Sequence, residues 1–308
     1  MASLPTVVAS SVIRSSQQGE SHGGVYLVDL EHRSWRQVID WNDPAISWEG
    51  RGWDRGLRGI AFHAGHVYLA ASDEVFVYAP DFRMVKSYRN PYLKHCHEIC
   101  VHEDRLYLTS TGFDSVLEFD LRVERFVKGY FLDRRTTPQP QLRVFDPAGA
   151  DGPPPSMECH INNVSRDGTL YVSGTKMDTL WAITDSQLEA YAAIPFTTHN
   201  ARPYRQGVLC QDSGNDRVAY LDRRGAVIEA FLLVQYPQES LTWTHLTADR
   251  ARQAFGRGLC LTDDQRIIAG SSPSTISVYE FGNPRPVASV QLTNDIRNAI
   301  HGLEIWPY

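Results

Sequence analysis

The sequence predicts an all-β protein, a six-bladed β-propeller, and three observations lead to that prediction. Six short segments begin alike, each with a histidine or an arginine at the equivalent position. Each of the first five is followed by a strand-like run, a turn and another strand-like run. Two of the intervals between the segments, from position 58 to 97 and from 160 to 199, are both 39 residues long, close to the roughly 40–45-residue period of four-stranded blades. The six segments start at Arg58, His97, His160, His199, Arg257 and His301.

The first five repeats each contain two further strand segments. β-branched and aromatic residues dominate these segments, and Gly, Asp, Asn and Ser interrupt them where a turn is expected. No part of the chain shows a sustained helical period. In chain order, the strand–turn–strand segments are 66–78, 105–120, 169–183, 207–221 and 266–279.

The sixth repeat is split between the two ends of the chain. Residues 302–306 are expected to form its innermost strand, and 6–12, 25–30 and 35–40 its outer three. Pairing the last strand with the first would close the propeller and remove the free edges of an open array. We therefore expect a single propeller domain over residues 1–308.

Four longer inserts separate the repeats, at 13–24, 41–56, 132–158 and 233–255. In a propeller, the first residue of each innermost strand lies on the same face as the turns between second and third strands. The connections between blades return to that face as well. The insert at 132–158 is rich in Pro and Gly and too long for a simple connector, so we expect it to form a lid or wall there.

Composition excludes several kinds of partner. The 308 residues carry a net charge of −6 without a basic stripe, which argues against nucleic acid. No apolar stretch reaches membrane-spanning length, and the first residues lack the pattern of a signal peptide. Five cysteines without a CxxC spacing indicate reduced, buried thiols, so we expect a cytoplasmic protein.

Three neighbouring repeats begin with histidine, and this pattern predicts a metal centre. The imidazoles of His97, His160 and His199 would converge from adjacent innermost strands, and imidazole binds zinc, copper, iron and nickel. His301 begins the repeat on the opposite side. We expect it to act as a fourth metal ligand or as a general acid or base. The competing interpretation is a pocket that binds an anion or does acid–base chemistry without metal.

Other polar residues are expected to complete the site. Arg58 and Arg257 flank His301, and their guanidinium groups suit a carboxylate, phosphate or phosphonate of the substrate. Glu98 is a candidate catalytic residue beside His97, or a partner for the ring of a ligating histidine. It could equally hold neighbouring blades together through backbone amides. Lys176 lies in a turn where other repeats carry Asp, which makes it a candidate substrate-binding residue.

These histidines resemble the axial ligands of two groups of propeller metalloenzymes. The amidating lyases that act on peptidyl-hydroxyglycines have six blades and a three-histidine zinc site. Carotenoid-cleaving dioxygenases have seven blades and a four-histidine iron site. The resemblance covers the architecture of the whole chain, and as chemistry it covers His97, His160, His199 and His301 alone. The blade count differs from the dioxygenases and the reduced cysteines from the secreted lyases, so their substrates do not carry over.

The sequence therefore predicts a metal-dependent enzyme acting on a small anionic substrate. A neutral ligand set leaves the charge of a divalent transition metal uncompensated, which favours activation of a bound anion or water. A non-haem iron oxidoreductase is preferred, and a zinc-dependent lyase or hydrolase is the first alternative, with copper as a further metal. A propeller that binds an anion without catalysis is the second alternative. A protein-interaction propeller is disfavoured because the polar groups concentrate in the channel.

Overall fold

The computed structural model describes residues 3–17, 19–42, 56–185 and 187–308. Over these residues the chain forms six antiparallel sheets and a single 3₁₀ turn, η2 at Gln238–Ser240. The chain divides into two compact units. The first contains residues 1–58, 211–219 and 229–308, and the second contains residues 59–210 and 220–228.

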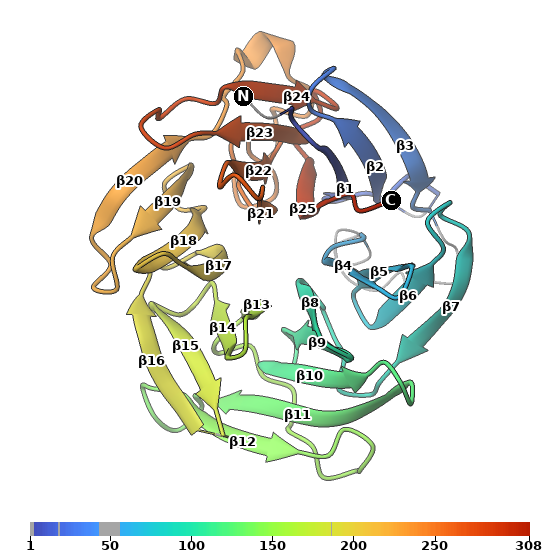
Figure 1. Cartoon of the computed structure of the whole chain (residues 1–308), viewed down its shortest axis with the longest axis vertical. Coiled ribbons are helices and arrows are strands. Elements are labelled where there is room, and N and C mark those ends of the chain that lie inside the picture. The colour runs from blue at the N-terminus through green and yellow to red at the C-terminus, as the bar shows by residue number, and fades with distance from the viewer. Residues whose placement is uncertain (1–2, 18, 43–55, 186) are drawn as a thin grey trace. The chain divides into compact units, whose positions relative to one another are not determined.

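Two of the sheets, whose strands are labelled in Figure 1, lie wholly in the first unit. One has the order β25-β1-β2-β3, so the last strand of the chain pairs with the first. Its strands are β1 Thr6–Ile13, β2 Gly23–Asp29, β3 Ser34–Asp40 and β25 Asn298–Ile305. The other sheet contains β21 Leu259–Leu261, β22 Ile267–Ser271, β23 Thr275–Tyr279 and β24 Ala288–Gln291. Side chains such as Val7, Val28, Ile276 and Ile300 form a shared core between the two sheets.

Three sheets lie in the second unit. Alternating apolar residues of neighbouring sheets pack into common cores there, as in the cluster that joins Val116, Ile161 and Val172. The strands are β4 Ile60–His63, β5 His66–Ala71, β6 Glu74–Tyr78 and β7 Met84–Arg89; β8 Ile99–His102, β9 Arg105–Ser110, β10 Ser115–Asp120, β11 Arg125–Asp133 and β12 Gln141–Phe145; and β13 Ile161–Arg166, β14 Leu170–Gly174, β15 Thr179–Thr184 and β16 Gln187–Ala193.

The sixth sheet draws its residues from both units. Its strands, in order, are β17 His199–Tyr204, β18 Gly207–Asp212, β19 Arg217–Leu221 and β20 Val227–Leu232. Six sheets of four strands, one of them extended by a fifth, confirm the predicted fold class. The pairing of β25 with β1 is the split repeat expected from the sequence. The single domain over residues 1–308 stays a prediction.

The insert at 132–158 differs from the expectation of a simple lid or wall. Part of it forms β12, a fifth strand that pairs with β11 at the outer edge of its sheet. Phe145 packs edge-to-face on Tyr92 with 5.2 Å between ring centroids, and Arg143 binds Asp133. These contacts explain why the segment extends the sheet. Most of the insert at 41–56 lies outside the described residues.

Asp133, the last residue of β11, leads to a prediction about the stability of the protein at low pH. The buried Asp133 carboxylate accepts hydrogen bonds from Arg135 at 2.8 and 2.9 Å and lies 3.1 Å from Arg143. These contacts, led by those of Arg135, lower its pKa to about 2. Because the folded-state pKa lies below the ordinary value of 3.8, the stabilisation is complete above that value and is lost as pH falls toward about 2.

We expect Asp133→Asn to lower the free energy of unfolding by about 1–3 kcal/mol near neutral pH. The difference from the unmodified protein should shrink steadily as pH falls through this window. Urea unfolding of both proteins at a series of pH values measures it, with Asp151→Asn as an exposed control. A stability difference that stays constant with pH would contradict the conclusion that the arginines stabilise the ionised carboxylate of Asp133.

Candidate functional site

The second unit contains the three histidines predicted as metal ligands. His97 precedes β8 by two residues, His160 directly precedes β13, and His199 is the first residue of β17. His97 and His199 are buried and His160 is partly exposed. The rings of His97 and His160 lie 5.7 Å apart between centroids and are tilted by 60°. The structure thus brings these two predicted residues together.

Two of these histidines share a hydrogen-bonding pattern. Nδ1 of His97 lies 2.7 Å from the carbonyl oxygen of His95, and Nδ1 of His199 lies 3.1 Å from that of Thr197. A carbonyl only accepts, so Nδ1 carries a proton, and in the neutral ring Nε2 is then the nitrogen with the lone pair. Metal-binding histidines are oriented in this way. The hydroxyl of Thr111, 2.8 Å from Nδ1 of His97, strengthens the arrangement on that ring.

A buried aspartate holds the backbone at His160. His160 has a positive φ of 52°, which side chains other than glycine adopt at a cost. Oδ1 of Asp114 accepts the His160 N–H at 2.8 Å, and Oδ2 accepts the Cys159 N–H at 3.2 Å and the Ser156 hydroxyl at 2.7 Å. Burial raises the pKa of the Asp114 carboxyl. In the sequence, Asp114 stands in a turn where other repeats also carry Asp, and no pattern there predicts its contact with His160.

Glu98 connects two inner strands. Its Oε2 accepts a hydrogen bond from Asn200 Nδ2 at 3.0 Å, and its Oε1 accepts the N–H of Ile99 at 3.2 Å. Asn200 in turn accepts a hydrogen bond from Arg202 at 2.7 Å. Glu98 thus has a structural role that differs from the expected one: it links the start of β8 to β17 through the side-chain amide of Asn200, while its backbone-amide contact is to Ile99 next to it. Its catalytic role stays a prediction.

Lys176 is exposed and contacts the insert beside it. Its Nζ donates to the carbonyl of Met157 at 2.9 Å, while Arg134 donates to the carbonyl of Lys176 at 2.6 Å. Both contacts tie the turn after β14 to the segment 132–158. A substrate-binding role for Lys176 stays a prediction beside this anchoring role.

The histidines fit a metal in part. Two imidazoles bound to one metal at about 2.0–2.1 Å have ring centroids roughly 5 Å apart, so the separation of His97 and His160 suits a shared ion. Within the described residues, no three His, Cys, Asp or Glu side chains are arranged to hold one metal ion. The three-histidine centre therefore stays a prediction that the paired rings and their Nδ1 contacts support.

The first unit contains the other three predicted residues, Arg58, Arg257 and His301. All three are buried, Arg58 completely. Arg58 and Arg257 each precede an inner strand by two residues. His301 instead lies inside β25, where the pairing with β1 shifts register.

The structure brings Arg257 and His301 into contact. Nη1 of Arg257 hydrogen-bonds Nε2 of His301. A guanidinium only donates, so Nε2 of His301 accepts and the ring is neutral. His301 as metal ligand or acid–base residue stays a prediction. The observed contact makes it a partner that orients Arg257.

Arg257 belongs to a cluster of guanidinium groups that the sequence did not reveal. The guanidinium carbons of Arg14, Arg252 and Arg257 lie 4.8, 4.7 and 4.4 Å from the ring centroid of Phe255. Burial, and then the charges of Arg14, Arg58 and Arg252, hold the pKa of Arg257 well below its ordinary value. Nε of Arg257 is buried and has no hydrogen-bond partner among the described residues.

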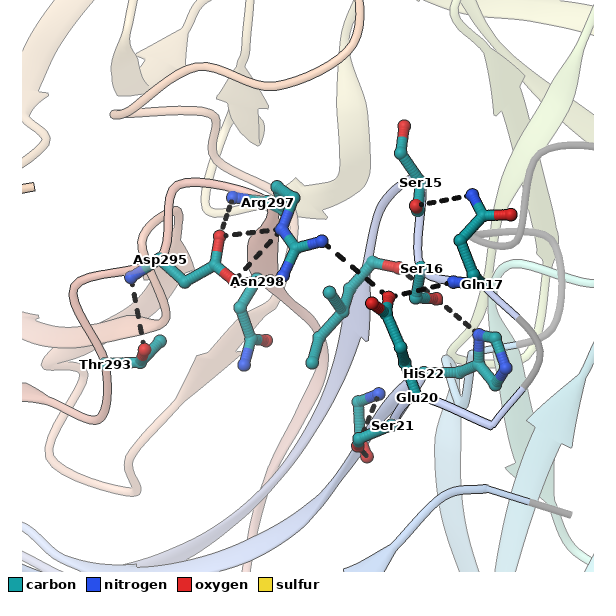
Figure 2. Close-up of polar contacts among 12 residues, drawn as sticks. Ser15, Ser16, Gln17, Glu20, Ser21, His22, Thr293, Asp295, Arg297 and Asn298 are labelled. Carbon is teal, nitrogen blue, oxygen red and sulfur yellow. Dashed lines mark hydrogen bonds and ion pairs between the residues drawn. The ribbon is translucent and has the colours of Figure 1, made fainter. Parts of the chain in front are cut away.

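Arg297 is another largely buried arginine of the first unit, and carboxylates compensate its charge. Its side chain is 11% exposed and lies between Asp295, at 2.8 Å, and Glu20, at 4.0 Å (Figure 2). It also stacks on Trp243 with 3.7 Å to the ring centroid. Arg257 has an aromatic ring as well, but no carboxylate of the described residues pairs with it.

Comparisons with known proteins identify the fold alone. No protein-family model matches the sequence, and no curated protein matches it. A protein of unknown function from Bacteroides caccae is similar with a TM-score of 0.59 and 9% identity, covering 97% of this chain and 98% of that one. The WD40 β-propeller domain of Doa1 is similar with a TM-score of 0.53 and 8% identity, covering 95% and 84%. The chain is therefore a six-bladed β-propeller.

A streptogramin B lyase is also similar, with a TM-score of 0.42 and 13% identity over 75% of this chain and 70% of that one. This likeness is too distant to bear on function. In the described part of the chain, no helix is long and apolar enough to cross a membrane.

Proposed function

We propose that this chain is a metal-dependent enzyme acting on a small anionic substrate. Arg58 and Arg257 would hold the anionic group of the substrate. His97, His160 and His199 would hold a divalent transition metal. The observation that carries the proposal is the buried guanidinium of Arg257, which hydrogen-bonds His301 and is acted on by the charges of three other arginines, while no carboxylate of the described residues pairs with it. A buried charge in such surroundings is costly unless a bound anion compensates it.

The metal half of the proposal is supported by His97, His160 and His199. A bound ion would supply Lewis-acid or redox chemistry. The protein's part is to fix the imidazoles: the carbonyls of His95 and Thr197 orient two rings, and Asp114 fixes the backbone of the third. A non-haem iron oxidoreductase remains our first choice, and a zinc-dependent lyase or hydrolase the alternative.

Elemental analysis tests the metal directly. Protein purified without added metal or chelator should contain about one equivalent of iron, zinc or copper. His160→Ala should lower that content at least about tenfold. His102→Ala, which changes a histidine at the far end of β8, should retain it. Equal metal content in the two variants, or an empty protein even after reconstitution, would refute the metal centre.

A propeller that binds an anion without catalysis is the second candidate, and the surroundings of Arg257 favour it equally. We expect Arg58→Met to weaken phosphate binding about tenfold or more, because a charge-assisted contact is lost. Its metal content should stay unchanged. Calorimetric titration and elemental analysis of the same preparation measure both, and loss of both would contradict the separate roles of arginines and histidines.

A further inference from the structure

The arginines around Phe255 come from separate parts of the first unit. Arg14 follows β1, Arg252 lies in the insert at 233–255, and Arg257 precedes β21. All three guanidinium carbons lie within 4.8 Å of the centroid of one ring. Arg58, which precedes β4, is close enough for its charge to act on Arg257. Three guanidiniums thus gather on one ring, and the charge of a fourth arginine acts on one of them.

Within this cluster, Arg252 and Arg257 are compensated differently. Arg252 binds Asp216 through Nη1 and the Ser213 carbonyl through Nη2. Arg257 has the ring of Phe255 and the nitrogen of His301, and both are neutral. A cation–π contact offsets only a small part of the cost of burying an uncompensated ion. The Phe255 contact therefore does not offset the charge of Arg257.

Two members of the cluster are fixed and still reachable from solvent. Arg14 donates to the Arg250 carbonyl at 3.2 Å and is partly exposed. The Arg252 side chain is 27% exposed and is held by Asp216 and Ser213. Both side chains are therefore held in place on the ring against which the buried Arg257 also lies. Preorganised donors lose little entropy on binding.

We propose that Arg14, Arg252 and Arg257 form a subsite for a doubly charged, phosphate-type group around Phe255, with Arg58 adding to its positive charge. The inference rests on the anion-binding half of the proposed function and names the class of substrate. A carboxylate has two coplanar oxygens and one charge, which match a single guanidinium fork. A phosphoryl or phosphonyl group has three oxygens pointing in different directions and up to two charges. It can therefore accept hydrogen bonds from guanidiniums that belong to separate segments of the chain.

Titration calorimetry on the full chain tests the subsite with inorganic phosphate, methylphosphonate and acetate as probes. We expect phosphate and methylphosphonate to bind at least about tenfold more tightly than acetate. Arg14→Gln and Arg257→Met should each weaken phosphate binding about tenfold or more. Arg285→Gln removes an exposed arginine in the turn before β24 and serves as the control for net charge. It should leave phosphate binding unchanged.

Each outcome decides the inference. Acetate binding as tight as phosphate would overturn the phosphate class. Equal weakening by Arg14→Gln and Arg285→Gln would show a general charge effect and overturn the location. Failure of every probe to bind would overturn the subsite. Because the metal content is measured separately and depends on His160, phosphate binding without metal would leave this inference standing while the metalloenzyme proposal fails.

Discussion

Asp114→Ala is expected to lower the free energy of unfolding by roughly 3–6 kcal/mol. The carboxylate accepts hydrogen bonds from two backbone N–H groups and from the Ser156 hydroxyl. Removing a buried acceptor leaves each donor unsatisfied at a cost of about 1–3 kcal/mol. The loss is partly offset because burial disfavours the ionised carboxyl, as its raised pKa indicates. Urea unfolding measures the difference.

Two further variants should each lower the free energy of unfolding by less than Asp114→Ala does. Ser156→Ala removes one donor and leaves the carboxylate, so it should cost about 0.5–1.5 kcal/mol. Asp114→Asn keeps one acceptor oxygen for His160 but places an amide N–H₂ toward the Cys159 N–H. Its loss of unfolding free energy should therefore lie between those of Ser156→Ala and Asp114→Ala. Equal losses in Ser156→Ala and Asp114→Ala would show that the carboxylate does not hold this segment. Asp114→Asn should also lower metal content, because the backbone that carries His160 is released.

Local patterns were enough to predict the strands and the positions that begin each repeat. Alternating apolar residues and turn residues specify each hairpin over short distances, and five of the six predicted residues precede or open an inner strand. His301 departs from the pattern because β25 begins at Asn298 and shifts register against β1. The sequence repeat carries no signal for such a bulge.

Contacts between distant segments could not be predicted in the same way. Asp114 meets the backbone of His160 across 46 positions of sequence. Phe255 gathers arginines from an irregular insert and from the ends of strands. Neither residue has a periodic pattern, because loops follow no repeat. A lone Arg14 or Arg252 looks like an ordinary surface charge in the sequence.

The charge of Arg257 has a consequence for the stability of the unliganded protein. Methionine occupies a similar volume and can pack on Phe255 without a charge. Replacing a poorly compensated buried ion by an apolar residue is often neutral or stabilising by about 1–4 kcal/mol. The lost hydrogen bond to His301 costs about 0.5–1.5 kcal/mol. We therefore expect Arg257→Met to unfold at the same or a higher urea concentration than the unmodified protein when no anion is present.

Arg297→Met is the matched comparison, because Arg297 is also largely buried on an aromatic ring but pairs with Asp295 and Glu20. Removing it leaves Asp295 without its cation, so this variant should be less stable by about 1–3 kcal/mol. At one phosphate concentration that saturates the unmodified protein, phosphate should stabilise that protein and Arg297→Met more than it stabilises Arg257→Met, since the stabilisation grows with the affinity of the folded state. If both substitutions destabilise the anion-free protein equally, Arg257 is compensated within the fold, and the argument for a bound anion fails with it.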